Sequence, residues 1–489
     1  MSPGKGNNRY DAMIRDSSSA RSVDALRVTL QAILATLALY GVLSVPALVH
    51  RWGISAAGLG LLVVWAAVVG VGASALLRGR PRVRLVIFLA VVVVLSRWAT
   101  TMLAVGRVSP GDPDIYPVIA RQLLAGLGLY FDQADMGVRV FALYPPAYPV
   151  LLASWGAVAG FSIPSLLALN LLVDAAAAWV VTLIGEQLEA PDAGRAAGFL
   201  YLVVPSMLFS APLAQKEGLA ILLVLILAYV WIAASQGRFS GWRGAVMLGL
   251  PAGLLALTQP GWAPIAALFG LAMAVRMGWG QMLRFGIGGA LVASVVMLPW
   301  WLRNWLVFSA FVPLTSAGGI GLWIGNNADA TGNWMPQPAA LHGLPELEFA
   351  RRAGKMAQAW IAEHPLGFLQ LNATKFFRAV GIGQFGPYRY LIMTPPISAA
   401  TGALLLPLSH GAHLLMLTGG ALALRVRRSP GIALIILLVA ACFAQLALFG
   451  VWFEFGERHR EFLTPFLLLL GCMAAKPAIW RTGWDSNPR

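Results

Sequence analysis

Acidic side chains are concentrated in three polar stretches of a chain that is otherwise strongly apolar. Eleven of the 20 acidic residues lie within 106–143, 303–390 and 451–462. Carboxylates grouped in this way can transfer protons, coordinate a divalent cation through oxygen, or cap helices. Asp112 and Asp114 lie close to the end of an apolar segment and are the first candidates for such chemistry. Because loops of membrane proteins are polar for other reasons as well, the distribution leaves a functional and a purely structural explanation open.

Two other acidic residues, Asp174 and Glu217, lie in or beside apolar runs, where a charge is costly and usually functional. Glu217 follows Lys216, so a buried structural ion pair is the alternative to a role in chemistry. His410 and His413 are three residues apart on a predicted helix, but no carboxylate stands near them. We therefore expect both histidines to be packed inside the protein or to lie at the membrane interface, and no metal site is predicted from them.

The composition identifies the class of protein. Of the 489 residues, 58% are hydrophobic and 11% are charged, and the mean hydropathy is +0.74. Soluble domains carry about 25% charged residues, and disordered chains combine low hydrophobicity with high net charge. Both classes are excluded, and a polytopic membrane protein remains. The net charge of +15 indicates cytoplasmic loops that face anionic lipid, so we expect membrane lipid and no nucleic acid among the partners.

Apolar runs divide the chain into helices that could cross a membrane. They lie at about 28–49, 56–77, 85–105, 145–160, 162–184, 196–214, 218–234, 244–257, 263–275, 285–302, 396–424, 430–450 and 463–475. Because a crossing needs about 20 residues, we expect an all-α polytopic membrane protein with about 12 (11–13) transmembrane helices. A single transmembrane domain would occupy 28–475, between cytoplasmic tails at 1–27 and 476–489.

Short arginine-rich loops mark the cytoplasmic side of a membrane protein. They contain Arg78, Arg80, Arg82, Arg84, Arg238, Arg243, Arg276, Arg284, Arg425, Arg427 and Arg428. The extracytoplasmic loops are then 106–143, 303–390 and 451–462. Within the second of these, we expect segment 346–380 to form two amphipathic helices at the membrane surface. Lys355, Lys375 and Arg378 would there meet lipid phosphates.

The parity of the crossings identifies one apolar run that does not span the membrane. Three runs lie between Tyr144 and Glu217, but only two crossings there keep the later arginine loops in the cytoplasm. The run 145–160 is short and begins with Pro145 and Pro146. We expect it to be a half-helix or a re-entrant element.

Two motifs near the first outer loop carry a family resemblance. After the third apolar run stand GDPDIYPVIARQLLAGLGLYFD and ALYPPAYPVLLASWGAVAG. They resemble the first outer loop of membrane glycosyltransferases with the C-type fold. The similar branch uses polyprenyl-phosphate sugars (glycosyltransferase family 39) and includes protein O-mannosyltransferases and the lipid A aminoarabinose transferase. The pattern is carried by Asp112, Tyr116, Ala120, Gly126, Gly128, Pro145, Pro146, Tyr148 and Pro149.

Two later segments extend the resemblance. The stretch PWWLRNWLVFSAFVPLTSAGGIGLWIGNNADATGNWMP resembles the second signature of the same branch. ERHREFLTPFLLLL is similar to its RYR-then-PF element. The most specific piece is Trp323–Gly332, which contains Asn326 and Asn327. Together the motifs cover the chain from about residue 85 to 475.

The resemblance implies an enzyme that transfers a hexose or pentose from a polyprenyl-phosphate donor to an acceptor hydroxyl, with inversion. The acceptor would be a glycan, a lipid or a protein, reached on the outer face of the plasma (inner) membrane. Such transfer needs a base for the hydroxyl and positive groups for the departing phosphate. Asp112 occupies the family position of the base, and we expect partial burial to raise its pKa. Asp114 is the alternative base, or it caps the following helix.

The phosphate side of the site departs from the family pattern. Relatives place Lys or Arg directly before the PP pair, where this chain has Tyr144. Arg139, Arg458 and Arg460 are the candidates to replace it, because arginine binds phosphate with two donors. Snorkelling at the interface is the alternative for each of them. Glu217 matches an acidic position that the family places after a proline-containing helix.

The aromatic residues and the cofactor leave alternatives open. Tyr116, Trp323 and Trp334 could stack on sugar rings or belong to the interfacial aromatic belt. No cofactor is required by these motifs, and a divalent cation (Mg or Mn) is the one option. Asp112 and Asp114 alone supply too few ligands for it.

Other classes of membrane protein are the alternatives. The sequence contains no Walker or dinucleotide-binding glycine loop, no HExxH and no GxSxG. This argues against an ATP-driven pump and an enzyme that uses nucleotide sugars. A transporter or flippase is the next class, but the chain shows no internal repeat of the kind common in those folds. A ligase of lipid-linked glycans shares the lipid donor and is the third class.

Overall fold

The computed structural model describes residues 17–79, 81–425 and 430–481, which are predominantly helical. Nine helical stretches in this part of the chain are long and apolar enough to cross a membrane. They comprise α2 (Ser17–Leu43) with α3 (Val45–Trp52), α4 (Ala56–Leu77), α5 (Val83–Met102), α8 (Ile163–Gln187), α11 (Glu217–Ser235), η1 (Pro260–Trp262) with α13 (Ile265–Met277), α14 (Trp279–Phe308), α19 (Ala399–Ala423), and α20 (Pro430–Gln445) with the π-helical turn η3 (Leu446–Gly450). The protein is therefore an all-α polytopic membrane protein, as expected. Residues 1–16 and 482–489 of the expected tails, and Arg80, Arg427 and Arg428, lie outside the described residues.

Three further helices coincide with the remaining expected crossings. These are α9 (Pro191–Val203) followed by α10 (Pro205–Ser210), α12 (Gly241–Ala256) and α21 (Thr464–Arg481). The break between α9 and α10 falls at Pro205, because a proline disfavours helical backbone at the residue before it. Val204 accordingly has an extended conformation, with φ −64° and ψ 136°. With the nine longer stretches, these helices match the expected number of about 12.

Helix α7 (Ala147–Ala159) is the apolar run that was expected not to cross. It contains 13 residues. At about 1.5 Å per residue this is roughly 20 Å, whereas the hydrocarbon core of a bilayer is about 30 Å thick. Its length agrees with a half-helix or re-entrant element. It packs against α6 (Asp112–Leu124), and this pair forms one wall of the candidate site.

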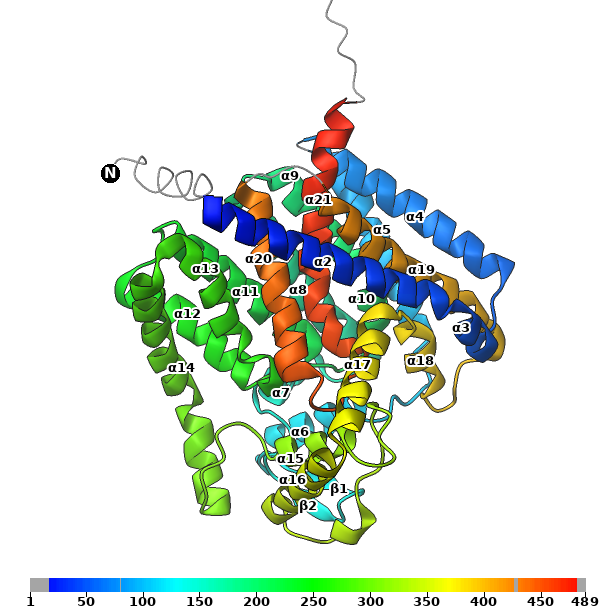
Figure 1. Ribbon diagram of the computed structural model, residues 1–489. Helices are drawn as coiled ribbons and strands as arrows, with labels where there is room; N and C mark the ends of the chain where they lie inside the picture. The colour runs from blue at the N-terminus through cyan, green and yellow to red at the C-terminus, as the bar shows by residue number, and fades with distance from the viewer. Residues whose placement is uncertain (1–16, 80, 426–429, 482–489) are drawn as a thin grey trace, which may run out of the picture.

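The long loops fold into a cap of short elements at one end of the helical bundle. Besides α6, these are β1 (Phe131–Gln133), β2 (Val138–Val140), α15 (Ala317–Gly325), η2 (Ala339–Leu341), α16 (Glu346–Glu363), α17 (Pro365–Gly381), α18 (Phe385–Leu391) and η4 (Glu457–Leu463). In Figure 1 the hairpin β1–β2 and helices α6, α15 and α16 lie at the bottom. The start of α2 and the end of α21 lie toward the top. The cap thus lies at the opposite end of the bundle from the start of α2 and the end of α21.

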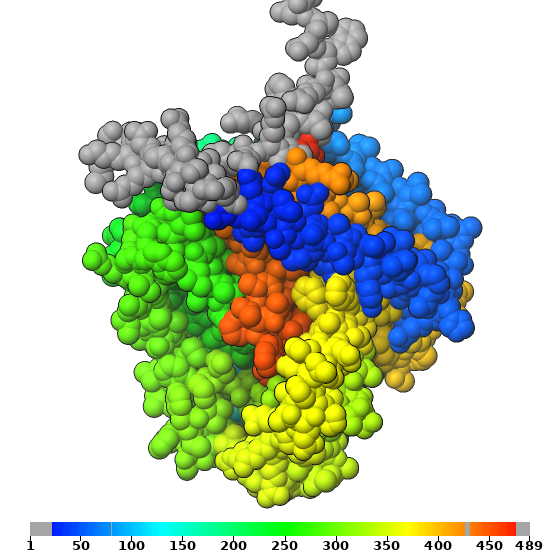
Figure 2. Space-filling model, viewed as in Figure 1, coloured from blue at the N-terminus to red at the C-terminus, as the bar shows by residue number. Residues whose placement is uncertain are grey.

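The surface of the bundle is strongly apolar. On α14, Val295 is 68% exposed and Leu306 is 83% exposed. Such side chains suit contact with lipid tails, and they would be unfavourable against water. Figure 2 shows the surface hollowed between the lower part of α14 and α17. Because the exterior of the bundle is apolar, we expect polar substrate groups to bind at the polar cap.

The two helices expected at 346–380 are present as α16 and α17, but the expectation for Lys375 was wrong. Its side chain is fully buried, and Nζ donates to the carbonyl oxygens of Gly325 (3.1 Å) and Phe453 (3.3 Å). Lys375 therefore joins two loops and cannot reach a lipid phosphate. The reason is that it lies on the face of α17 that packs against the cap, whereas Lys355 on α16 is exposed.

His410 and His413 pack inside the protein, as expected. His410 Nδ1 accepts a hydrogen bond from the backbone N–H of Gly383 (3.1 Å), and Nε2 lies 3.0 Å from the carbonyl oxygen of Gly41. His413 Nε2 lies 2.7 Å from the carbonyl oxygen of Val380. Both rings therefore tie α19 to the connection between α17 and α18.

The position of α7 gives a test of the topology. We expect an alkaline phosphatase fused after Gly160 to be active, because this enzyme needs the oxidising outer compartment and α7 would return the chain there. A fusion after Gly185, at the end of α8, should be inactive and should instead fluoresce when green fluorescent protein replaces the phosphatase. A cytoplasmic signal from the Gly160 fusion would show that α7 crosses the membrane.

Candidate active site

Three segments that are far apart in the chain meet at Asp112. This residue is in the first turn of α6, and its Oδ2 lies 2.9 Å from Nη1 of Arg458 in η4. The Nζ of Lys216, directly before α11, lies 3.8 Å from the same oxygen. The structure thus brings together Asp112 and Arg458, which were predicted for the site, and Lys216, which was named only as a neighbour of Glu217.

Further charged groups surround Arg458. Its guanidinium lies 3.5 Å from a carboxylate oxygen of Glu454 and 3.8 Å from Oε1 of Glu217. Arg389 on α18 is held beside the start of α6 by donating to Ser109 Oγ (2.8 Å) and to the Pro110 carbonyl (3.2 Å). We call Asp112, Lys216, Glu217, Arg389, Glu454 and Arg458 the charge cluster. It contains three carboxylates and three cations, so its charges balance when all are ionised.

The expectation that burial would raise the pKa of Asp112 was wrong. Burial does favour the neutral acid, but the charges of Lys216 and Arg458, the Arg458 hydrogen bond and the charge of Arg389 outweigh it. The pKa of Asp112 is therefore lowered below its ordinary value. Burial would lower the pKa of Arg458, yet its carboxylate partners, Glu454 foremost, hold it well above the usual value. Asp112 is thus ionised at neutral pH.

Three tyrosines form an aromatic wall beside the cluster. The Tyr116 ring lies 5.0 Å from that of Tyr148 and 5.7 Å from that of Tyr144, in edge-on contacts. Lys216 Nζ lies 5.7 Å from the Tyr116 ring centroid, a cation–π contact. Burial, followed by the charges of Asp112 and Glu217, raises the pKa of Tyr116 well above its usual value, so the phenol stays protonated. Tyr144 therefore belongs to the wall of the candidate site.

Three of the predicted polar residues are not part of the charge cluster. Asp114 is exposed on the first turn of α6, where its negative charge interacts favourably with the N-terminal end of the helix dipole. Arg139 on β2 pairs with Asp132 on β1 at 2.8 Å, and its side chain is half exposed. Arg460 is buried and donates to the carbonyls of Ala379 and Ile382. Both arginines are thus engaged with partners outside the charge cluster.

Asn326 and its neighbours act on the segment that carries Arg458. Asn326 Nδ2 donates to the Trp452 carbonyl (2.6 Å), and the Phe455 N–H donates to the Gly332 carbonyl (2.9 Å). Lys375 completes the set through the Phe453 carbonyl. We call these contacts the loop clamp. The signature stretch Trp323–Gly332 therefore positions 452–455, and through it Glu454 and Arg458.

Asn327 has a local role in the same stretch. Its Nδ2 donates to the Trp323 carbonyl (2.8 Å), and its Oδ1 accepts from the Asp329 N–H (2.9 Å). Asn327 thus fixes the turn that follows α15.

The buried amine of Lys375 in the loop clamp has a lowered pKa. Burial, with a smaller contribution from the charge of Arg378, lowers the pKa of Lys375 to about 7.

Sequence reasoning missed Arg389 and the clamp function of Lys375. Each had a signal, because a single cation stands in an otherwise uncharged stretch: FGPYRYL for Arg389 and NATKFF for Lys375. A charge kept among apolar residues is costly unless it has partners. The partners themselves come from other elements, so only the folded structure identifies them.

The residues of the charge cluster do not fit a divalent cation. Both cations nearest to Asp112 approach the same oxygen, Oδ2, and would repel a metal ion there. No group of three or more His, Cys, Asp or Glu side chains suited to a metal ion occurs within 17–79, 81–425 and 430–481. We therefore derive no step through Mg or Mn.

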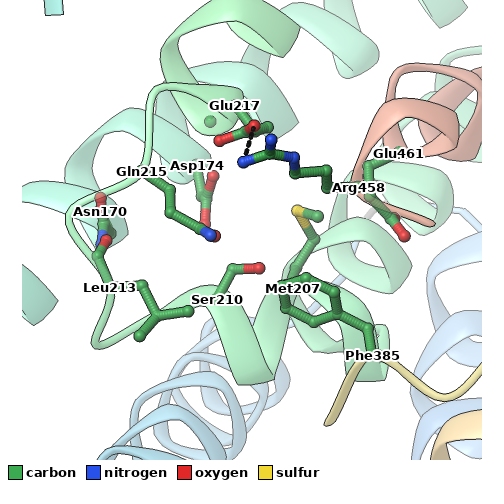
Figure 3. Close-up of a pocket in the computed structure, with 11 residues that line it drawn as sticks. Asn170, Asp174, Met207, Ser210, Leu213, Gln215, Glu217, Phe385, Arg458 and Glu461 are labelled. Carbon is green, nitrogen blue, oxygen red and sulfur yellow. Dashed lines mark hydrogen bonds and ion pairs between the residues drawn. The ribbon is translucent and has the colours of Figure 1, made fainter. Parts of the chain in front are cut away.

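A pocket lies next to the charge cluster, between α8, α10, α11 and η4 (Figure 3). Arg458 and Glu217 border it on one side. Asp174 of α8 lies deeper and forms a 2.6 Å ion pair with Arg97, which is fully buried on α5. This pairing provides a structural reason for the acidic residue inside an apolar helix.

Comparisons with known proteins gave similarities among solved structures. No protein-family model and no curated protein matched the chain. The archaeal oligosaccharyltransferase AglB from Archaeoglobus fulgidus, in complex with an inhibitory peptide and a dolichol-phosphate, is similar with 13% identity and a TM-score of 0.47. The match covers 82% of this chain and 52% of that one. For the apo form of the Archaeoglobus fulgidus oligosaccharyltransferase the identity is 16%, the TM-score 0.47, and the coverage 80% and 51%. The chain spans about half the length of these structures.

The loop clamp predicts the effect of Gly332→Ala. Gly332 has φ +81°, and an added Cβ would lie 2.1 Å from Cγ of Lys375. We expect a loss of stability of at least about 1–3 kcal/mol, because the backbone is strained and Lys375 must move. Thermal unfolding of the purified protein measures it. Gly318→Ala on α15 is the control, since its Cβ meets no atom within 4 Å. Equal stability of the two variants would contradict the clamp.

Proposed function

We propose that this chain is an integral membrane glycosyltransferase with its site on the extracytoplasmic face of the plasma (inner) membrane. The donor would be a polyprenyl-phosphate-linked hexose or pentose, and the acceptor a hydroxyl group of a glycan, lipid or protein. The family 39 resemblance supplies the expectation of inversion at the anomeric carbon. Among the structural neighbours, one oligosaccharyltransferase is described in complex with a dolichol-phosphate and an inhibitory peptide.

The observation that carries the proposal is the contact of Asp112 with Arg458 and Lys216. A carboxylate that can accept a proton and cations that can bind a phosphate are the two requirements of glycosyl transfer from a lipid phosphate. Here the carboxylate is that of Asp112, and its Oδ2 lies 2.9 Å from Arg458 Nη1 and 3.8 Å from Lys216 Nζ. They lie at the end of the bundle where the polar loops gather, and the chain offers no nucleotide-binding motif.

The proposed reaction divides the work between these groups. Asp112 accepts the proton of the acceptor hydroxyl as its oxygen forms a bond to the anomeric carbon. The bond between that carbon and the phosphate oxygen breaks, and its electron pair stays on the leaving polyprenyl phosphate. Arg458, Lys216 and Arg389 stabilise the negative charge that develops there. The neutral phenol of Tyr116 can donate a further hydrogen bond, since its hydroxyl has no partner among the described residues.

The ion pair also connects donor binding to the basicity of Asp112. In the resting protein, Lys216, Arg458 and Arg389 lower the pKa of Asp112, which makes it a weak base. A donor phosphate that takes Arg458 would remove part of this stabilisation and add a negative charge nearby. Both changes raise the pKa of a carboxyl group. Asp112 would therefore become a stronger base only when the donor is present.

Asp112→Asn tests the proposed base, with Asp114→Asn as the matched control two residues away. Asn keeps the shape of Asp but cannot accept a proton at neutral pH. Because general-base catalysis contributes about 10²–10⁴-fold, we expect Asp112→Asn to lower the transfer rate at least about a hundredfold. Asp114→Asn should cost much less. Release of polyprenyl phosphate from a radiolabelled polyprenyl-phosphate sugar measures the rate, and thermal unfolding checks that both variants are folded.

A folded Asp112→Asn protein with a near wild-type rate would remove the base assignment. If Asp114→Asn were inactive instead, the two roles would be exchanged. Uptake of the lipid-linked sugar into vesicles without bond cleavage would support a transporter or flippase and contradict the glycosyltransferase proposal.

Treatment with EDTA tests whether a divalent cation takes part. We expect the transfer rate of the purified protein to be unchanged, because Lys216 and Arg458 both contact Oδ2 of Asp112 and would repel a metal ion there. Loss of activity in EDTA that Mg²⁺ or Mn²⁺ restores would contradict this expectation.

A further inference from the structure

Six polar side chains besides Arg458 line the pocket beside the charge cluster. They are Asn170, Asp174, Ser210, Gln215, Glu217 and Glu461. Figure 3 shows the Gln215 and Ser210 side chains directed into the pocket, with the Glu217 carboxylate beside Arg458. Phe385 and Met207 supply an apolar side. A pocket with a few convergent polar groups and an apolar wall is typical of a small-molecule site.

Two of these acids already have their partners within the protein. Asp174 is paired with Arg97 and lies 3.3 Å from the hydroxyl of Tyr201. Glu461 Oε2 accepts hydrogen bonds from Ser206 (2.7 Å) and Thr464 (3.1 Å). Their roles in the fold account for their burial.

Glu217 and Gln215 lack such partners. Each is only 6% exposed. Neither oxygen of Glu217 has a hydrogen-bond partner among the described residues, and the Arg458 nitrogen nearest to it is 3.8 Å away. The Gln215 side chain is directed into the same pocket, and its amide forms no hydrogen bond to the described residues (Figure 3). Buried polar groups are almost always hydrogen-bonded, so the unsatisfied Glu217 carboxylate, with the Gln215 amide in the same pocket, points to a ligand that supplies the bonds.

We propose that this pocket binds the sugar of the donor and that Glu217 and Gln215 hydrogen-bond to its hydroxyl groups. The inference rests on the proposed function, because the sugar is placed by its phosphate. Arg458 borders both the charge cluster and the pocket. A sugar joined directly to a phosphate on Arg458 would therefore enter the pocket.

The chemistry of the lining also limits the kind of sugar. A carboxylate accepts hydrogen bonds from hydroxyl groups, and an amide both donates and accepts them. A neutral sugar with several hydroxyl groups satisfies both side chains. A uronic acid would bring its carboxylate next to that of Glu217, and like charges repel. The pocket thus selects neutral, hydroxyl-rich sugars and disfavours acidic ones.

The test compares the binding of lipids with and without a sugar to the purified full chain in nanodiscs. The probes are polyprenyl phosphate alone and polyprenyl phosphates that carry glucose, mannose, galactose, arabinose or glucuronic acid. We expect at least one neutral sugar to tighten binding about tenfold or more over the bare lipid, as a hydrogen bond to a charged group does. Glucuronic acid should give no such gain.

Gln215→Ala should lower this gain in affinity, with the bare lipid bound as in the wild type. Glu217→Gln, which also removes a charge beside Arg458, should lower the ratio of sugar-bearing to bare-lipid affinity. Gln281→Ala, an exposed glutamine on α14, is the control and should keep the gain. If the wild-type protein transfers sugar but the pocket variants keep the full gain, the sugar-site inference is wrong and the proposed function stands. Equal weakening of the bare and the sugar-bearing lipids would also overturn the inference, because the residues would then act on the fold or the phosphate. If the wild-type chain neither binds nor cleaves any of these lipids, the proposed function itself fails.

Discussion

The ion pair between Asp112 and Arg458 is the contact on which the rest of the candidate site depends. The two residues are 346 positions apart in the chain, and neither side chain is more than 26% exposed. Removing either partner would leave a poorly solvated charge, which is far more costly than the pair itself is stabilising. The start of α6, the start of α11 and η4 must therefore keep fixed relative positions. Lys216 and Glu454 share the charge among several groups and so reinforce this constraint.

The cap holds these elements in place mainly through backbone groups. Glu346 accepts hydrogen bonds from the N–H groups of Phe141 and Ala142, and Arg303 donates to the Phe141 carbonyl, which fixes the chain just before Tyr144. The loop clamp does the same for the chain before Arg458. Since each bond uses a main-chain atom, it specifies where a segment lies without requiring a particular side chain there. Glu346, Arg303 and the residues of the loop clamp are thus distinct from those of the charge cluster.

The sequence alone was sufficient for the class of fold. Long apolar runs can avoid exposing unpaired backbone groups in a bilayer only as helices, so hydropathy and length predict them directly. The helix α7 was predicted in the same way, and the parity of the crossings with its short, proline-led run is the basis for expecting it not to span the membrane. Polar loops that alternate with these runs identified the stretches that build the cap. Such properties are local, and they depend on composition within about 20 residues.

The tertiary structure alone decided which polar residues meet. Asp112, Glu217 and Arg458 were singled out by type and motif, but Arg139 and Arg460 were equally plausible in the sequence. Arg139 pairs across the hairpin and Arg460 binds carbonyls of the adjoining chain, so neither belongs to the charge cluster. The direction of the Asp112 pKa shift also depended on its neighbours, because burial and nearby cations act in opposite directions. Electrostatic interactions depend on distances in space, and the spacing of residues along a chain does not encode those distances.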